Sequence, residues 1–209
     1  MIIKVCGMNE YENIQRVSEL DVNWIGFIFY HKSPRGTTGT SLVLPDLLRG
    51  ENQKRVGVFV NASFEAITDI ARVCMLDIIQ LHGDETPDDC HRLQKRGYSL
   101  IKAFPIATKE DLERTKEYEG RVDYFLFDTK CEGYGGSGNR FDWSVLAEYH
   151  GETPFLLSGG IRPGSVGEIR RFQHPRLAGI DLNSGFEIRP GLKDVEALRT
   201  FIEGIRLPS

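Results

Sequence analysis

The residue best placed to do chemistry near the start of the chain is Cys6, which ends the short apolar run Ile2–Val5. Such a run predicts a buried strand, and Gly7 directly after it predicts the end of that strand. A thiol at a strand tip can be held rigidly toward a cleft, and such a position suits a catalytic thiolate or a general base. A free cysteine is more commonly a small buried hydrophobe, so this role needs support from partners elsewhere in the chain.

A carboxyl group ends a comparable run in the second half of the chain. Asp128 follows the strongly apolar residues 124–127, so its side chain is predicted to be partly desolvated. Desolvation raises the pKa of a carboxyl group and suits it to general acid catalysis. The alternatives are a helix N-cap or a structural partner for Lys102. An acid and a base facing one small phosphorylated substrate are typical of an isomerase, which needs neither a metal nor a redox cofactor.

Two glycine-containing turns predict a site for a phosphate group. They follow the last two apolar runs of the chain, and their residues are Gly159, Gly160, Asn183, Ser184 and Gly185. Glycine lets the backbone approach a ligand closely, and backbone N–H groups supply the local positive field that an anion needs. The alternative is that both segments are ordinary turns of the fold.

The elements that position these groups are short apolar runs of strand length. They lie at Ile2–Cys6, Trp24–Phe29, Val56–Val60, Asp77–Leu81, Ser99–Phe104, Tyr124–Asp128, Phe155–Ser158 and Ala178–Leu182. Amphipathic helical patterns lie between them, and helix N-caps are predicted at Asn9, Ser63, Thr86, Thr108, Asp142 and Asp194. This alternation predicts parallel β-α units, and a repeat of about 26 residues fits a closed eightfold β/α (TIM) barrel.

The whole chain, residues 1–209, is predicted to be a single TIM-barrel domain, since no linker or low-complexity segment divides it. The segment Thr37–Gln53 predicts a short or irregular second helix. A doubly wound open sheet is the alternative fold, but the glycine-rich fingerprint typical of its first turn is missing. Chemistry in a barrel lies at the carboxyl ends of the strands, where the chain places polar residues that include Asn61, Gln80, His82, Lys102 and Asp181.

Composition and charge argue against several classes of function. The chain carries a formal net charge of −4, without the basic face that nucleic-acid binding requires. Its 4 cysteines form no CxxC pair and its histidines no paired ligand spacing, so no metal site is predicted. Neither a signal peptide nor an apolar stretch of membrane-spanning length is recognisable. We expect a cytoplasmic protein that binds neither nucleic acid nor membrane.

The strings around these residues form a set that covers nearly the whole chain. They include Lys4–Met8, Lys32–Arg35, Arg55–Asn61, Ile79–Glu85, Phe127–Asp128, Gly135–Gly138, Leu157–Ile161, Gly179–Glu187 and Pro190–Asp194. In this order they closely resemble the phosphoribosylanthranilate isomerase family of tryptophan biosynthesis. The resemblance implies an Amadori rearrangement of N-(5-phosphoribosyl)anthranilate to 1-(2-carboxyphenylamino)-1-deoxyribulose 5-phosphate.

The resemblance also implies roles for individual residues. Asp128 would protonate the furanose ring oxygen as general acid, and Cys6, as thiolate, would remove the proton from C2 of the sugar. Arg35 would hold the anthranilate carboxylate, a task that its planar guanidinium group suits. The substrate would further contact Gln80, His82 and Asp181, and its phosphate would be held by Gly159, Gly160, Asn183, Ser184 and Gly185.

The chain departs from the family in places, and competing functions exist. Ser158 stands where the family usually has Ala, and Thr37–Gln53 matches the second helix poorly. A related phosphosugar barrel, the histidine-pathway aminoaldose isomerase, has a carboxylate where Cys6 stands. A non-catalytic binding module would have lost Cys6, Asp128 or the phosphate turns. Both a monomer and a homodimer are compatible with the sequence.

Overall fold

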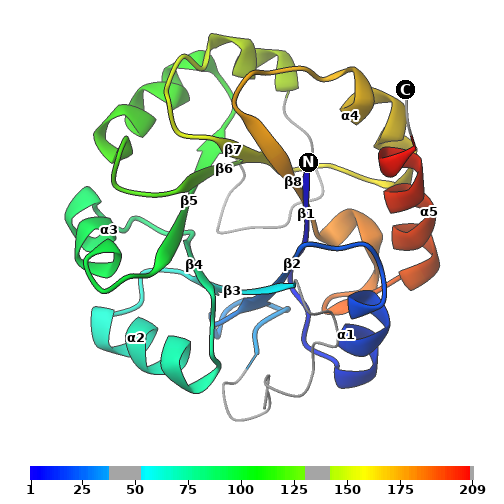
Figure 1. The fold of residues 1–209 in the computed structure, drawn as a ribbon, viewed down its shortest axis with the longest axis horizontal. Coiled ribbons are helices and arrows are strands. Elements are labelled where there is room, and N and C mark those ends of the chain that lie inside the picture. Colours follow the sequence, from blue (N-terminus) through cyan, green and yellow to red (C-terminus); the bar gives the residue numbers. More distant parts are fainter. Residues whose placement is uncertain (38–52, 130–141, 208–209) are drawn as a thin grey trace.

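A closed barrel of parallel strands, with helices around its outside, forms the body of the protein (Figure 1). The computed structural model describes residues 1–37, 53–129 and 142–207. The strands follow one another around the barrel in chain order from β1 to β8, and β8 closes it by pairing with β1. The predicted eightfold β/α barrel is confirmed, and the alternative of an open doubly wound sheet is wrong.

The barrel strands lie close to the predicted apolar runs. They are β1 (Ile2–Val5), β2 (Trp24–Ile28), β3 (Lys54–Phe59), β4 (Ile78–Leu81), β5 (Ser99–Ile106), β6 (Tyr124–Thr129), β7 (Phe155–Leu157) and β8 (Leu177–Leu182). A small antiparallel hairpin follows β8 and consists of β9 (Glu187–Arg189) and β10 (Leu192–Lys193). The α-helices are α1 (Tyr11–Ser18), α2 (Phe64–Val73), α3 (Pro87–Gln94), α4 (Val166–Arg171) and α5 (Val195–Arg206).

The 3₁₀ helices η2 (Lys109–Tyr118) and η3 (Trp143–Glu148) stand where the sequence predicts helices. The 3₁₀ turns η4 (Pro163–Ser165) and η5 (Ser184–Phe186) precede α4 and follow β8. The predicted irregular second helix lies outside the described residues except for its end positions Thr37 and Gln53, and the loop 131–140 also lies outside them. Among the described residues, no helix is long and apolar enough to cross a membrane.

Most helices begin at the residues that the sequence marks as caps. The side chains of Ser63, Thr86 and Asp194 accept hydrogen bonds from backbone N–H groups in the first turns of α2, α3 and α5. The prediction for α1 is wrong, because its N-cap is Glu10. Asn9 instead packs against the turn of the β9–β10 hairpin, which approaches too closely for any side chain at Gly191.

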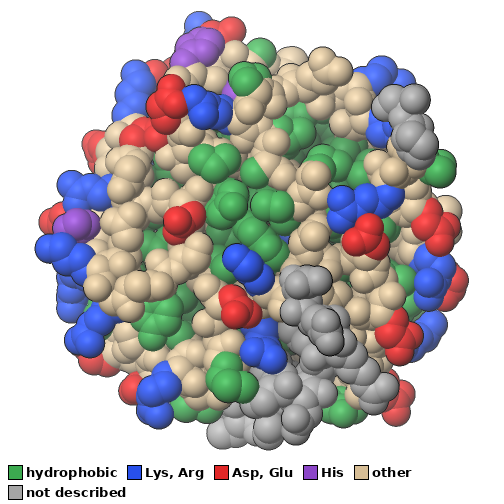
Figure 2. All heavy atoms as spheres, in the orientation of Figure 1, with side chains coloured by type: hydrophobic (Ala, Val, Ile, Leu, Met, Phe, Trp, Pro, Cys, Tyr) green, Lys and Arg blue, Asp and Glu red, His purple; other side chains and the backbone are tan. Residues whose placement is uncertain are grey.

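The inside of the barrel is filled by apolar side chains that alternate along each strand with residues facing the helices. The inner cluster includes Trp24, Val56, Ile78, Ile101, Ala103, Leu126 and Leu156. Viewed along the barrel axis in Figure 2, hydrophobic side chains gather near the centre, and charged side chains lie both beside them and around the rim. The same alternation turns Cys6 and Asp128 inward, toward the space enclosed by the strand ends.

Candidate active site

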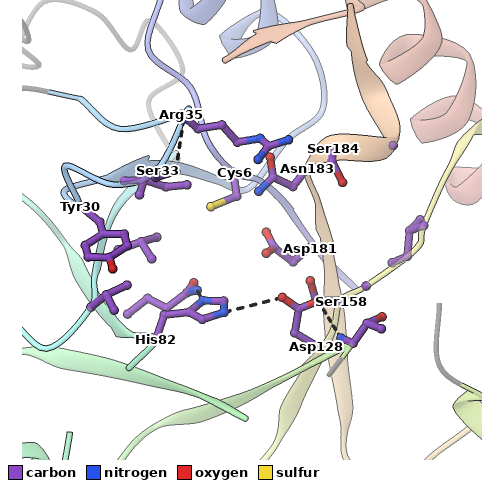
Figure 3. Close-up of a pocket in the computed structure, with 18 of the residues that line it drawn as sticks. Cys6, Tyr30, Ser33, Arg35, His82, Asp128, Ser158, Asp181, Asn183 and Ser184 are labelled. Atoms are coloured by element: carbon purple, nitrogen blue, oxygen red, sulfur yellow. Dashed lines mark hydrogen bonds and ion pairs between the residues drawn. The ribbon is translucent and has the colours of Figure 1, made fainter. Parts of the chain in front are cut away.

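One pocket at the carboxyl ends of the strands is lined by every residue predicted for the site. Figure 3 shows Cys6, Asp181 and Asp128 facing the same cavity, with His82 across from Asp128. The lining residues include Cys6, Arg35, Gln80, His82, Asp128, Gly159, Gly160, Asp181, Asn183, Ser184 and Gly185. The structure thus brings together residues that the sequence spreads over six β-α units, while the role of each residue stays a prediction.

Cys6 is positioned by the strands on either side of it. Its backbone N–H donates to the carbonyl oxygen of Leu182 at 2.9 Å, so strand pairing continues one residue beyond β1. The chain turns at Gly7, whose φ of 76° favours glycine. Gly26 on β2 leaves room for the thiol, because a Cβ there would lie 2.8 Å from Cys6 Sγ. Cys6 is only 3% exposed, yet it lines the pocket.

A buried ion pair lies next to Cys6. Lys4 and Cys6 are two residues apart on one strand, so both side chains point into the barrel. Lys4 Nζ lies 2.8 Å from Oδ1 of Asp181, its register partner on β8, and its positive charge also acts on the Cys6 thiol. Burial raises the pKa of Cys6, Lys4 opposes that rise, and Asp181 adds to it.

Asp128 is held as a carboxyl group that can be protonated near neutral pH. Burial raises its pKa from 3.8 to about 6. Two hydrogen bonds oppose the rise: the backbone N–H of Thr129 donates to Asp128 Oδ1 at 2.8 Å, and the Ser158 hydroxyl donates to the same carboxylate. At pH 7 roughly a tenth of the molecules would carry the proton, which makes Asp128 a competent acid.

His82 faces Asp128 as a neutral ring. Burial, together with the charges of Lys102 and Lys4, lowers its pKa to about 3. Gln80 Nε2 lies 2.9 Å from His82 Nδ1, so we assign the amide as donor and the ring proton to Nε2, which lies 3.6 Å from Asp128 Oδ2. Gln80 Oε1 is buried and has no hydrogen-bond partner among the described residues.

Arg35 reaches the pocket from the loop after β2, and Glu187 holds its guanidinium group. Arg35 Nε donates to both carboxylate oxygens at 2.9 Å, and Nη2 donates at 2.7 Å. Lys193 Nζ lies 2.7 Å from Glu187 and donates to Asn183 Oδ1 at 2.8 Å. Burial would raise the pKa of Glu187, but Arg35 and Lys193 lower it, so this carboxylate stays charged.

The glycine turns expose backbone to the pocket. Gly159 and Gly160 have φ values of 81° and 69°, and a Cβ on Gly159 would lie 2.6 Å from the backbone nitrogen of Thr129. A Cβ on Gly185 would collide with the carbonyl oxygen of Ile161. Only backbone atoms of these glycines can face the pocket, as in phosphate sites built from main-chain N–H groups.

Part of the pocket wall is apolar. Its residues come from β2, β3 and the loop after β2, and they are Ile28, Tyr30, Pro34, Val58 and Val60. A wall of this composition, next to a guanidinium group, suits an aromatic ring that carries a carboxylate.

Two polar residues predicted at strand tips do not line this pocket. Lys102 alternates with the inward-facing Ala103 and therefore lies outside the barrel wall, where its Nζ contacts Glu85 at 3.2 Å and the carbonyl oxygen of Gly83 at 2.8 Å. Asn61 donates its backbone N–H to the same Glu85 at 2.8 Å. The alternative that Lys102 pairs with Asp128 is wrong.

Three charged residues around the site were missed by the sequence reasoning. Lys4 carries a signal in its spacing, because a lysine in phase with Cys6 inside an apolar run must face the barrel interior. Glu187 and Lys193 carry no such signal. Glu187 holds Arg35, which lies 152 positions away in the sequence, and Lys193 acts through its ion pair with Glu187.

Fold and pocket together define a β/α-barrel protein with a candidate active site at the carboxyl ends of its strands. Residues 3–204 match the family model described as N-(5'phosphoribosyl)anthranilate (PRA) isomerase. The N-(5'-phosphoribosyl)anthranilate isomerase of Parabacteroides distasonis is 62% identical over 218 residues, which cover 100% of this chain and 95% of that protein. The chain therefore belongs to the N-(5'-phosphoribosyl)anthranilate isomerase family.

Solved structures agree with this assignment. The phosphoribosyl anthranilate isomerase from Thermotoga maritima has a TM-score of 0.86 at 33% identity, with 99% of each chain covered. A phosphoribosyl anthranilate isomerase in complex with reduced 1-(o-carboxyphenylamino)-1-deoxyribulose 5-phosphate has a TM-score of 0.82 at 31% identity, again with 99% of each chain covered. The predicted family, fold and enzyme class, an isomerase of tryptophan biosynthesis, are confirmed.

Proposed function

We propose that the protein catalyses the Amadori rearrangement of N-(5-phosphoribosyl)anthranilate with Asp128 as general acid and Cys6 as general base. The observation that carries these roles is the meeting of both side chains in one pocket that also contains two glycine turns and Arg35. Acid, base and sites for two anionic groups are what the rearrangement of a phosphorylated, carboxylated aminosugar needs.

The pocket suggests how the substrate lies. Its phosphate binds the backbone of Gly160 and of the turn Asn183–Gly185, and its anthranilate ring lies along the apolar wall. Arg35 keeps one guanidinium nitrogen, Nη1, outside its bonds to Glu187, and this nitrogen holds the anthranilate carboxylate. Gln80 Oε1 would gain the hydrogen-bond donor that it lacks among the described residues from the substrate's amine or a sugar hydroxyl.

The first step opens the sugar ring. Protonated Asp128 gives its proton to the furanose ring oxygen while the bond between that oxygen and C1 breaks. The lone pair of the anilinic nitrogen forms the C=N bond of a Schiff base. Neutral His82, whose Nε2–H points to Asp128, supports the carboxylate that this step leaves behind.

The second step moves hydrogen from C2. The Cys6 thiolate takes the C2 proton, and the electron pair of the broken C–H bond neutralises the iminium as an enolamine. Tautomerisation of the enolamine to the aminoketone completes the rearrangement, so no electrons enter or leave. Asp181 lines the pocket beside Cys6 and is placed to contact a sugar hydroxyl.

The two ionisations set the working pH range. The reactive form has a charged Cys6 and a protonated Asp128, yet the pKa of Cys6 is raised above 9.0 and that of Asp128 is about 6. The reactive form is therefore a small fraction of the molecules at neutral pH. Between the two pKa values its fraction is constant, because each gain in thiolate is matched by an equal loss of protonated Asp128.

Turnover by two variants tests the assignment. Cys6→Ser and Asp128→Asn should each lower kcat about 10²–10⁴-fold, the usual contribution of a general acid or base, while circular dichroism stays native. The loss of substrate fluorescence follows the reaction. Cys74→Ser, which removes a buried thiol from the end of α2, is the matched control and should keep kcat. Near-normal kcat in Cys6→Ser would remove Cys6 from its role.

We also propose a cytoplasmic protein that consists of one domain over residues 1–209 and binds no nucleic acid or membrane. Its partner is a small phosphorylated molecule, and its oligomeric state is that of a monomer or a homodimer. One relative from Thermotoga maritima is described as monomers generated from a dimeric phosphoribosylanthranilate isomerase. Light scattering after size exclusion distinguishes the two states for this chain.

A further inference from the structure

We propose that Lys4 is a positioning residue for the reaction, whose buried ammonium group fixes Asp181 in the pocket wall and acts as the counter-cation of the Cys6 sulfur. This inference rests on the proposed role of Cys6 as general base. It adds a residue that does not itself line the pocket and that acts on the substrate only through its two neighbours.

The position of Lys4 is unusual for a lysine. It is fully buried inside the barrel, whose inner cluster is made of apolar residues such as Val56 and Ile101. A buried charge costs several kcal/mol in desolvation, and ion pairs of this kind often stabilise a protein no more than apolar packing would. The need for a charge at this place is therefore not explained by folding alone.

The surroundings of Lys4 point to the thiol. Its partners are Asp181 on β8, at 2.8 Å, and Cys6 two residues further along β1. A thiolate beside a buried carboxylate would repel it, so a cation must stand near both for the thiolate to form. Among the described residues, Lys4 pairs with Asp181 and exerts the largest positive influence on Cys6, and Lys193 on β10 adds a weaker one.

The expected consequences have opposite signs for the two members of the pair. Removal of the ammonium group leaves burial and Asp181 to act on the thiol, so the pKa of Cys6 rises. Removal of the Asp181 charge leaves Lys4 without a competing carboxylate and removes a repulsion on the thiolate, so the pKa of Cys6 falls. In the double variant the loss of Lys4 dominates, because its influence on Cys6 exceeds that of Asp181.

The test is the alkylation rate of Cys6 by iodoacetamide as a function of pH, with Cys6 resolved from the other thiols by peptide mass spectrometry. At neutral pH we expect Lys4→Met to react at least about tenfold more slowly than the parent protein, and Asp181→Asn to react faster. Lys102→Met is the matched control, since it removes an equally buried ammonium group outside the barrel wall and should leave the Cys6 rate unchanged.

Each outcome decides the proposal. Unchanged alkylation in Lys4→Met, or slowing of the same size in Lys102→Met, would overturn it. If Lys4→Met does not fold, Lys4→Met with Asp181→Asn leaves no lone buried charge and should still slow the reaction, and Asp181→Asn alone should still speed it. The readout does not involve turnover, so a failure of Cys6 as catalytic base shows separately, as retained kcat in Cys6→Ser.

Discussion

Two buried lysines on barrel strands, Lys4 and Lys102, each pair with a carboxylate. They differ in the side of the barrel wall on which they lie and in the other partners of their ammonium groups. Lys102 lies outside the barrel wall, where Glu85 and the carbonyl oxygens of Gly83, Leu81 and Ala103 surround its Nζ. Lys4 lies inside the barrel, with Asp181 and the Cys6 thiol as its partners. The partners of Lys102 all belong to the fold around it, whereas Lys4 lies beside Cys6, the proposed general base.

The contacts of the two lysines distinguish a charge that holds the fold together from a charge with a proposed role in the reaction. Glu85 accepts backbone N–H bonds from Asn61 and Gly83 in addition to Lys102, so this pair fastens the turns after β3 and β4. Burial lowers the pKa of Lys102 against the opposing influence of Glu85, whereas Asp181 and Cys6 together raise the pKa of Lys4 despite its burial. Both lysines are deeply buried, so burial alone does not show which of them has a role in the reaction.

The largest effect should come from the structural pair. Lys102→Met leaves Glu85 buried without its cation and should lower the free energy of unfolding by about 3–5 kcal/mol. Urea titration measures this loss, and the folded fraction should keep the parent's pH profile of kcat/KM. A large change in that profile with little loss of stability would reverse the assignments of the two lysines.

The next largest effect concerns Asp128, whose substitution should raise the free energy of unfolding instead of lowering it. Its pKa is higher in the folded protein, about 6, than the ordinary 3.8, so its ionisation disfavours the folded state. Asp128→Asn should therefore raise the free energy of unfolding by roughly 3 kcal/mol above pH 6. The gain should shrink as the pH falls from 6 and vanish below about 4. A variant less stable than the parent at pH 7 would contradict a desolvated acid at this position.

A smaller effect is expected where a charge positions substrate. Glu187→Gln weakens the hold on Arg35 and should raise KM about tenfold with little change in kcat. Glu10→Gln is the matched control, since it removes a more exposed ion pair with Arg189 of the same hairpin. A fall in kcat at constant KM would move Glu187 from positioning the substrate to the chemistry itself.

The smallest effect should come from Ser158, whose hydroxyl lowers the pKa of Asp128. Ser158→Ala should move the acidic break in the pH profile of kcat/KM to a higher pH, by less than about one unit. It should also raise the plateau slightly, because more Asp128 is protonated at neutral pH. The pH dependence of kcat/KM measures both. A shift of this break to a lower pH would mean that Ser158 stabilises the protonated form of Asp128 instead.

Much of this arrangement follows from local sequence signals. Apolar runs and turn residues predict the strands, and the barrel then brings Cys6, Asp128 and the glycine turns to one end. Alternation along β5 also explains why Lys102 faces outward, although it lies near a strand tip. The bond between Arg35 and Glu187 is different. It joins residues 152 positions apart, so only the folded chain shows it.

In the proposed mechanism, Cys6 and Asp128 ionise as the base and acid of one reaction. The most direct test compares the pH profile of kcat/KM in the parent protein with the pKa of Cys6 measured by alkylation. We predict a broad plateau with a lower break near 6, set by Asp128, and an upper break on the alkaline side of an ordinary thiol pKa, which coincides with the alkylation pKa of Cys6. An alkylation pKa of Cys6 that does not match the upper break would contradict these roles.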